Sequence, residues 1–461
     1  MNYYKKTGND KISTSRMTTN RKPEFPLGNV CGRYFRYPLQ EGDSEGGLRI
    51  HGVYKESSPD YPLITYITVV FNRRKALERC MKSVWGQTYP NVEYIIIDGA
   101  SNDGTLELIQ KNEDKIDYYI SQKDHGIYDA MNKGIALASG DYICFMNSDD
   151  VCTPNAAHDV AKQIRKTHAD ILCGTRELWQ DGKKQFEKTY DRFPIHYCVF
   201  RYLQMYHQAT YASRKAFDIT GEFDKQYKLL ADWVWESQCI DNDLEICFFD
   251  DVLTRFNYDG ASYLGMEVRD DDWIRWIQNT FPEVTREDAE CLLFTFDMYR
   301  EDFFELSTVM PIIKKYSSNA KFLKAIYETS LMCIVYSWEN AIEELNEITL
   351  RKSDAGLVKQ YAKFGYTIEK VYYLLKSSIN EKREVTLEEI ENIAAIREEE
   401  MLIYKEIVCR RHLGKKYKSA WARVTILPRY SLEWNCSRKI RSSTELFRFK
   451  RGYMIKKARK E

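Results

Sequence analysis

The chain lacks any run of apolar residues that could cross a membrane. A spanning helix needs roughly 18 such residues in succession, and no segment of the 461 residues approaches that length. The Lys-, Thr- and Asn-rich start also has no apolar stretch of the kind found in signal peptides. We therefore expect a cytoplasmic protein.

The 12 cysteines include no Cys-x-x-Cys pair, the spacing typical of many zinc and redox sites. Cys144, Cys173 and Cys247 instead lie within apolar stretches that read as strands. This placement favours reduced, buried thiols over a metal site or disulfides.

The chain has no net charge, since 68 basic residues balance 68 acidic ones, but the two signs are unevenly distributed. From Arg410 to the end, 17 Lys and Arg accompany three acids, a charge of +14 that leaves −14 on residues 1–409. Aromatic residues are interspersed in this tail: Trp421, Tyr430, Trp434, Phe447, Phe449 and Tyr453. We expect it to bind an anionic membrane surface. A nucleic-acid arm is the disfavoured alternative, because the rest of the chain is acidic and holds no nucleic-acid motif.

A chain of this length is expected to form more than one domain. Changes of pattern divide it into a partly disordered N-terminal extension (1–60) with a possible edge strand at 48–54, an α/β domain (61–263), a helical domain (264–409) and the basic aromatic tail (410–461). In the helical domain, apolar residues recur at helical spacing. Thr386 and Glu389 have the spacing of a capping box at the start of one helix.

Three apolar strands of the α/β domain end in polar residues. The strand at 66–71 leads to Asn72, the strand at 95–97 to Asp98, and the strand at 142–146 to Asn147. Ligands of open α/β sheets bind outside the carboxyl ends of the strands. The sequence thus predicts a binding crevice at this edge.

Each of these polar residues also has a structural interpretation. Asp98 can end a strand in a turn, and Asp103 can cap the helix that follows. The quartet Asn147 to Asp150 can form an Asx-type turn before a helix, and Asp232 can cap a helix that opens near Trp233.

Several short motifs occur in a fixed order. They are Val69-Val70-Phe71-Asn72, Gln87 to Pro90, Asp98 to Thr105, Asp124 to Gly134, Asn147 to Asp150 and Ala231-Asp232-Trp233. In this order the motifs resemble family 2 glycosyltransferases over about residues 62–262. The resemblance implies an α/β fold of the GT-A type, a mostly parallel mixed sheet flanked by helices, followed here by a mainly α-helical C-terminal region.

The resemblance also implies roles for individual residues. The nucleotide-binding residues are Val70, Asn72, Asp98 and Asp103; the residues facing the donor sugar or phosphates are Asp129, Asn132 and Lys133; and the acceptor side has His207 and Gln208. Asp149, supported by Asp150, is the expected ligand of Mn²⁺ or Mg²⁺, which offsets charge on the leaving diphosphate. Asp232 is the expected general base.

These implications predict an inverting, metal-dependent transfer of one sugar from a nucleotide-sugar, UDP-linked, to a hydroxyl of a lipid-linked glycan acceptor in surface polysaccharide synthesis. The enzyme would be peripheral at the inner face of the cell membrane. Processive relatives carry Gln-x-x-Arg-Trp, whereas Asp272-Trp273-Ile274-Arg275-Trp276 lacks the Gln. A non-catalytic module that binds sugar-nucleotides or glycans is the alternative, suggested by Asn147 in place of the usual Asp and by Ala231 in place of the usual Glu.

Overall fold

The computed structural model describes residues 17–22, 30–180, 183–188, 205–257, 266–296, 306–327, 329–330 and 386–396. It separates into two compact units, Met1–Phe294 and Thr295–Glu461. The predicted boundary at residue 263 lies inside the first unit, and the basic aromatic tail lies outside the described residues.

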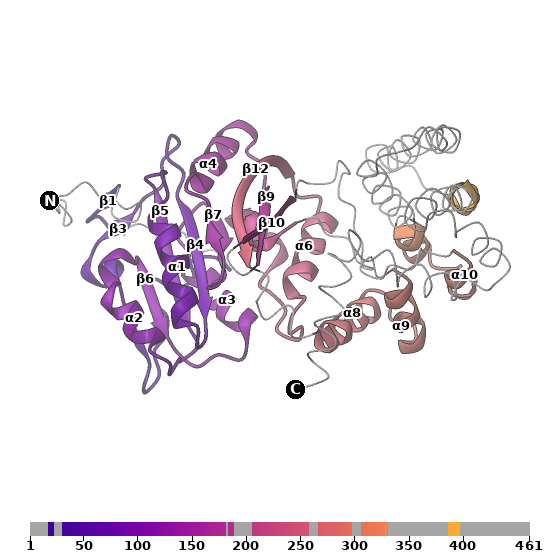
Figure 1. Cartoon of the computed structure of the whole chain (residues 1–461), viewed down its shortest axis with the longest axis horizontal. Coiled ribbons are helices and arrows are strands. Elements are labelled where there is room, and N and C mark those ends of the chain that lie inside the picture. The colour runs from indigo at the N-terminus through magenta and orange to yellow at the C-terminus, as the bar shows by residue number, and fades with distance from the viewer. Residues whose placement is uncertain are drawn as a thin grey trace, which may run out of the picture. The chain divides into compact units, whose positions relative to one another are not determined.

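The first unit is built on a mixed sheet whose centre is parallel (Figure 1). Strands β4 (Ile64–Val70), β5 (Val92–Asp98), β6 (Tyr118–Ser121) and β7 (Tyr142–Phe145) lie side by side in the order β6-β5-β4-β7. All four are buried throughout their length. Such strands read as continuous apolar runs because both faces of the sheet are covered.

Helices cover the two faces of this centre. α1 (Arg74–Trp85), α2 (Thr105–Lys111) and α4 (Ala156–Thr167) share one apolar core with Tyr66 and Ile96. α3 (Ile127–Leu137) packs on the opposite face, where Gly134 touches the side chain of Ile67. The prediction of a mixed sheet flanked by helices is confirmed. Because the strand order reverses between β4 and β7, the carboxyl ends of these two strands form a switch point.

The sheet continues beyond β7 with strands of both directions. β11 (Thr210–Ser213) runs antiparallel between β7 and β9 (Ile171–Gln180). β12 (Ile246–Asn257) lies parallel to β9 and antiparallel to β8 (Val151–Cys152), and β10 (Lys183–Lys188) pairs with β9. This half brings β8, which follows β7 closely, beside the end of β12.

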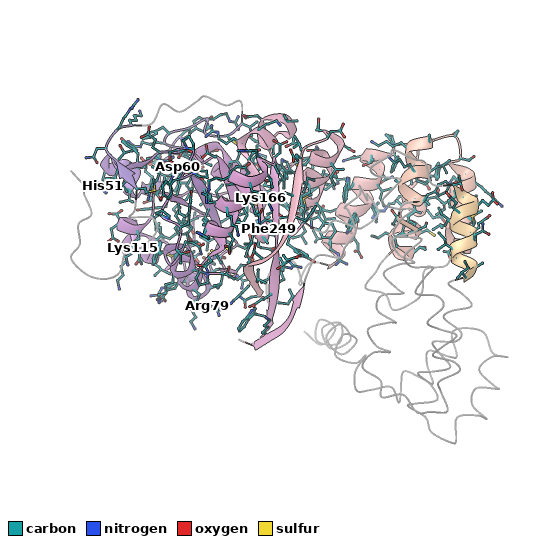
Figure 2. All side chains as sticks on the ribbon, turned by 90° about the horizontal axis from the view of Figure 1, so that it is seen from above. His51, Asp60, Arg79, Lys115, Lys166 and Phe249 are labelled. Carbon is teal, nitrogen blue, oxygen red and sulfur yellow. The ribbon has the colours of Figure 1, made fainter. Side chains whose placement is uncertain are left out.

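The predicted edge strand over 48–54 is wrong. Residues Leu48–His51 form a 3-10 turn, η2, and the edge strand that pairs with β6 is β2 (Ser44–Gly46). The turn begins after Gly47, whose φ of 101° suits glycine, and it ends with the exposed His51 (Figure 2). It buries Arg49, whose Nη2 lies 2.7 Å from Glu93 Oε1. The Arg49 guanidinium also donates to Phe35 O at 3.1 Å and to Leu137 O at 3.0 Å, so contacts with distant segments accompany the turn. Residues Tyr54–Lys55 form β3, which pairs with β1 (Thr18–Thr19).

The remaining elements of the first unit are mostly helical: η3 (Glu113–Lys115), η4 (His207–Ala209), α5 (Arg214–Thr220), α6 (Ala231–Asp241), α8 (Met266–Thr280) and α9 (Arg286–Thr295). In the second unit the described segments are helical, including α10 (Leu306–Lys315) and residues 387–396. The capping box predicted there is confirmed, since Glu389 N donates to Thr386 Oγ1 at 3.2 Å and Thr386 N donates to Glu389 Oε2 at 2.9 Å.

The cysteines that can be placed are Cys31, Cys80, Cys144, Cys152, Cys173, Cys239, Cys247 and Cys291, and all are free thiols. Cys144 and Cys173 are buried as predicted, whereas Cys247 is only partly buried. Among the helices that the structure describes, none is both long and apolar enough to pass through a membrane.

Candidate active site

The carboxyl ends of β4 and β5 carry strained backbone. Asn72, with a φ of 51°, and Ala100, with a φ of 64°, both adopt the left-handed region that non-glycine residues avoid. The two turns hold one another: Asn72 N donates to Ser101 Oγ at 2.8 Å, and Asn72 Oδ1 accepts from Asn102 N at 2.9 Å. Strained backbone of this kind is frequent at ligand-binding sites. The two turns therefore agree with a binding crevice at this edge of the sheet.

Asp98 organises the loop that follows β5. Its side chain is fully buried, and its carboxylate accepts from Ser121 Oγ at 2.6 Å, from Ser101 N at 3.1 Å and from Ser101 Oγ. Val70 contributes its carbonyl, which accepts from Gly99 N at 2.9 Å. Both residues therefore shape the crevice, and their contact with a nucleotide stays a prediction.

Asp103 ties the starts of two helices together. Its Oδ1 accepts from Thr105 N at 3.1 Å, and its Oδ2 accepts from Arg74 N at 3.2 Å. The bond from the Thr105 hydroxyl lowers the pKa of Asp103. The N-cap of α2 is Gly104 and has no side-chain cap, so the interpretation of Asp103 as the helix cap is wrong, and its carboxylate instead links the starts of α1 and α2.

Phe71 is a feature that the sequence analysis overlooked. Its ring is 60% exposed although it directly follows the buried strand β4. It lies beside Gly99, where a Cβ atom would meet the Phe71 ring at 3.4 Å and Asp124 Oδ2 at 2.5 Å. Gly99 thus permits a close approach of these side chains. The signal in the sequence was an aromatic residue placed between the strand end and Asn72.

The donor-facing residues predicted on α3 are only partly available. Asp129 Oδ1 lies 3.0 Å from Lys225 Nζ, and Lys133 Nζ donates to Lys123 O at 3.1 Å. Asn132 does not face a donor: its Nδ2 donates to Phe223 O at 2.8 Å and its Oδ1 accepts from Phe223 N at 3.0 Å. The prediction for Asn132 is therefore corrected, since its amide is used to fasten α3 to the segment before α6.

The quartet that follows β7 presents two carboxylates at the switch point. Asp150 is buried, and its Oδ1 accepts from Asn257 N at 3.1 Å, while Asn257 Nδ2 donates to Asp149 O. Burial, and then the charge of Asp149, raises the pKa of Asp150 well above its usual range. Asp150 Oδ2 has no hydrogen-bond partner in the described part of the chain.

The residues of this quartet could bind a divalent cation whose coordination is completed by other ligands. Within the residues that could be placed, no group of three or more His, Cys, Asp and Glu forms a metal site by itself. Asp149 and Asp150 do supply hard oxygen donors, and the unpartnered buried Oδ2 of Asp150 is an acceptor that a cation would satisfy. Mg²⁺ commonly binds through one or two carboxylates plus substrate phosphates. The donor set therefore suits Mg²⁺ or Mn²⁺ together with a diphosphate.

Asp232 lies at the centre of a hydrogen-bonded chain. It sits in the first turn of α6, whose N-cap is Leu230, so the interpretation of Asp232 as a helix cap is wrong. Its carboxylate is 7% exposed and accepts from Tyr128 Oη at 2.7 Å through Oδ1. Its Oδ2 lies 3.0 Å from His207 Nδ1, and His207 Nε2 lies 2.9 Å from Asn147 Nδ2.

This series of hydrogen bonds joins elements that are far apart in the sequence. Tyr128 comes from α3, Asn147 from the end of β7, His207 from η4 and Asp232 from α6. The sequence analysis placed His207 near the acceptor and assigned Tyr128 no role. The structure instead joins both to the candidate base, a relation that no local pattern reveals.

Further polar atoms without a hydrogen-bond partner lie near the hydrogen-bonded residues around Asp232. Asn147 Oδ1, Arg176 Nε and Glu236 Oε2 are buried without a hydrogen-bond partner among the described residues. Buried polar groups are nearly always paired in folded proteins, so their proximity to the quartet and to Asp232 is typical of a site completed by a ligand. Burial, and then the charge of Asp232, also raises the pKa of Glu236 well above its usual range.

Gln208 does not lie on an accessible acceptor side. It is 2% exposed, its carbonyl accepts from Thr254 Oγ1 at 2.6 Å, and its Oε1 accepts from Arg176 Nη1 at 3.4 Å. Arg176 itself is held between two rings, 3.8 Å from the centroid of Tyr206 and 4.4 Å from that of Phe256. The prediction for Gln208 is thus corrected, because the residue supports Arg176 from inside the domain.

Comparison with known sequences identifies the same part of the chain. Residues 65–222 match the family described as glycosyl transferase family 2. An uncharacterized glycosyltransferase of Mycobacterium tuberculosis is 33% identical over 181 residues, an alignment that spans 37% of this chain and 66% of that protein. A PGL/p-HBAD biosynthesis glycosyltransferase of Mycobacterium bovis is 26% identical over 191 residues (39% and 71%), and glycosyltransferase GlyA of Streptococcus pneumoniae is 28% identical over 178 residues (36% and 24%).

Two solved structures follow a chain trace similar to this one. Staphylococcus aureus TarS 1–349 in complex with UDP shares 15% identity, covers 70% of this chain and 92% of its own, and has a TM-score of 0.37. The mannosyltransferase PcManGT from Pyrobaculum calidifontis, in complex with GDP-Man and Mn²⁺, shares 12% identity, covers 70% and 88%, and has a TM-score of 0.40.

Proposed function

Since this chain is a family 2 glycosyltransferase with the family domain over residues 65–222, we propose that it moves one sugar from a nucleotide-sugar, UDP-linked, to a hydroxyl of a glycan acceptor. The transfer is metal-dependent and inverts the configuration at the sugar C1. The acceptor is a lipid-linked oligosaccharide used in surface polysaccharide synthesis.

The observation that carries this proposal is the placement of Asp232. A nearly buried carboxylate, fixed through both oxygens, is linked by His207 and Asn147 to the quartet that holds the metal-binding carboxylates. The expected base and the quartet that carries the expected metal ligands thus belong to one hydrogen-bonded cluster. A carboxylate held in this way can accept a proton without a large change of position.

The chemistry of the base follows from its surroundings. As the acceptor oxygen bonds to C1, on the face opposite the leaving phosphate, its proton passes to an oxygen of Asp232. The bond between C1 and the phosphate oxygen breaks, and the electron pair leaves with the nucleoside diphosphate. Because each carboxylate oxygen has two lone pairs, the bonds from Tyr128 and His207 leave positions open for this proton.

The donor side is supplied by the two strand ends and by the quartet. Asn72 and the loop organised by Asp98 accommodate the nucleoside, with Val70 and Asp103 nearby, and Asp129 and Lys133 lie on α3 for the sugar and phosphates. Asp149 and Asp150 hold Mn²⁺ or Mg²⁺. When bound, this cation stabilises the negative charge that develops on the leaving diphosphate.

The acceptor class and the location are proposed from other features. The sequence Asp272 to Trp276 lacks the Gln of processive synthases, which supports the addition of a single sugar. The basic aromatic tail would hold the enzyme at the inner face of the cell membrane, close to an acceptor on a polyprenyl carrier.

A nucleotide-release screen tests this function. Full-length protein is incubated with UDP-, GDP- and dTDP-sugars with Mn²⁺, Mg²⁺ or EDTA, and release of the nucleoside diphosphate is measured with and without candidate acceptors. We expect release from a UDP-sugar that stops with EDTA and in Asp149→Ala, but continues in Asp218→Asn, which alters an exposed carboxylate of α5. Tight donor binding without release under every condition would instead indicate a non-catalytic binding module.

A further inference from the structure

His207 connects the candidate base with the end of β7. Resting on the proposed role of Asp232, we propose that His207 is a positioning residue that acts as the neutral Nδ1–H tautomer. In this arrangement His207 donates to Asp232, and Asn147 fixes the tautomer by donating to the other ring nitrogen.

The direction of each hydrogen bond follows from the groups that meet. An ionised carboxylate can only accept, so the ring nitrogen 3.0 Å from Asp232 Oδ2 must carry a proton. In a neutral imidazole the other nitrogen is then an acceptor. It faces Asn147 Nδ2 at 2.9 Å, and an amide nitrogen is a donor. The three groups are therefore complementary when the ring is neutral and carries its proton on Nδ1.

Asn147 suits this arrangement better than an aspartate would. The resemblance to the family leads one to expect an Asp at this position, but a carboxylate there would also require a proton from the ring. Two carboxylates on opposite sides of one neutral imidazole would compete for its single proton. The amide of Asn147 removes this conflict and leaves the proton on the side of Asp232.

The consequence is a carboxylate with a fixed orientation. Tyr128 Oη holds Oδ1 at 2.7 Å and His207 holds Oδ2, so rotation of the Asp232 carboxylate breaks at least one bond. The His207 side chain is itself only 19% exposed, so water does not readily replace it. When a residue that orients a reactive side chain in this way is replaced, activity commonly falls about 10- to 100-fold.

The tautomer can be observed without any assay of activity. Full-length protein with ¹⁵N-labelled histidine has seven imidazole rings, and long-range ¹H–¹⁵N correlations distinguish Nδ1–H from Nε2–H rings. The His207 signals are identified by their absence in His207→Gln. We expect a neutral ring protonated at Nδ1, and either an Nε2–H ring or a doubly protonated ring would overturn the proposal. The result is the same whether or not the protein transfers sugars.

Two amide substitutions at His207 separate positioning from simple packing. The side-chain nitrogen of Asn lies at about the position of Nδ1, and that of Gln at about the position of Nε2. His207→Asn can thus still donate to Asp232, whereas the amide of His207→Gln reaches only Asn147, from whose Nδ2 its side-chain oxygen can accept. We expect His207→Gln to lower kcat about 10- to 100-fold with an unchanged donor KM, and His207→Asn to retain most of the rate.

The same pair of substitutions at His158 is the control. His158 is an exposed residue of α4, and its Nδ1 lies 3.3 Å from Asp159 Oδ1. Both His158 variants should keep the wild-type rate. Equal kcat values for His207→Gln and His207→Asn would overturn the positioning role. Full turnover in Asp232→Asn would instead remove the base from the proposed function, while the tautomer measurement would still report on His207.

Discussion

Replacement of Asp232 by Asn is the sharpest test of the proposed chemistry. Asn has nearly the same shape as Asp but cannot take up the acceptor proton. A general base contributes about 10² to 10⁴ in rate, and each factor of ten corresponds to about 1.36 kcal/mol of activation free energy. We therefore expect Asp232→Asn to lower kcat at least ~10²-fold with donor affinity little changed.

The structure also predicts a cost in stability for this variant. Two donors, Tyr128 Oη and His207 Nδ1, meet the two carboxylate oxygens of Asp232. An amide offers only one oxygen, so one of these donors loses its acceptor, and a hydrogen bond to a charged group contributes about 1.5–3 kcal/mol. The free energy of unfolding should fall by an amount of that order. Tyr128→Phe, which keeps the carboxylate, should lower the rate less than Asp232→Asn does.

The measurement combines nucleotide release with calorimetric titration of the donor. Rates are compared at saturating donor for the wild type, Asp232→Asn and Asp218→Asn. Asp218 provides the matched control because it is an exposed carboxylate in the neighbouring helix α5. Near-normal turnover of Asp232→Asn would refute the assignment of the base, and an equal loss in Asp218→Asn would show that the effect is not specific to the site.

Three further predictions concern the donor, the buried ion pair and the tail. Asp149→Ala should abolish metal-dependent donor binding, whereas Asp98→Ala should weaken UDP binding even without metal; equal, metal-independent losses in titration calorimetry would contradict this division. Glu93→Ala should lower the free energy of unfolding by about 3–5 kcal/mol because it removes the carboxylate that balances the charge of the buried Arg49 guanidinium, while Glu78→Ala, at an exposed pair, should change the urea midpoint little. Liposomes with anionic lipid should sediment the full-length protein but not a chain ending at Cys409, and binding that survives the truncation, or that ignores salt, would disprove the role of the tail.

The fold was largely predictable because its signals are local. Apolar runs that end in polar residues identified β4, β5 and β7, and the capping box at Thr386 located a helix start. The edge strand was mispredicted, since an alternating pattern at 48–54 does not reveal that Arg49 must reach Glu93 across the domain. That ion pair joins residues 44 positions apart, and no local pattern records it.

The sequence by itself determined the class of the protein and the candidate groups at the strand ends, because residue type and spacing specify strands, turns and carboxylate positions. Only the tertiary structure decided how these groups relate. Asn132 and Gln208 turned inward because their amides meet partners from distant segments, and Tyr128, Asn147 and His207 converged on Asp232 from separate elements. Hydrogen bonds depend on distances of a few tenths of an ångström between atoms from different elements, and such distances are set by the packing of the whole domain.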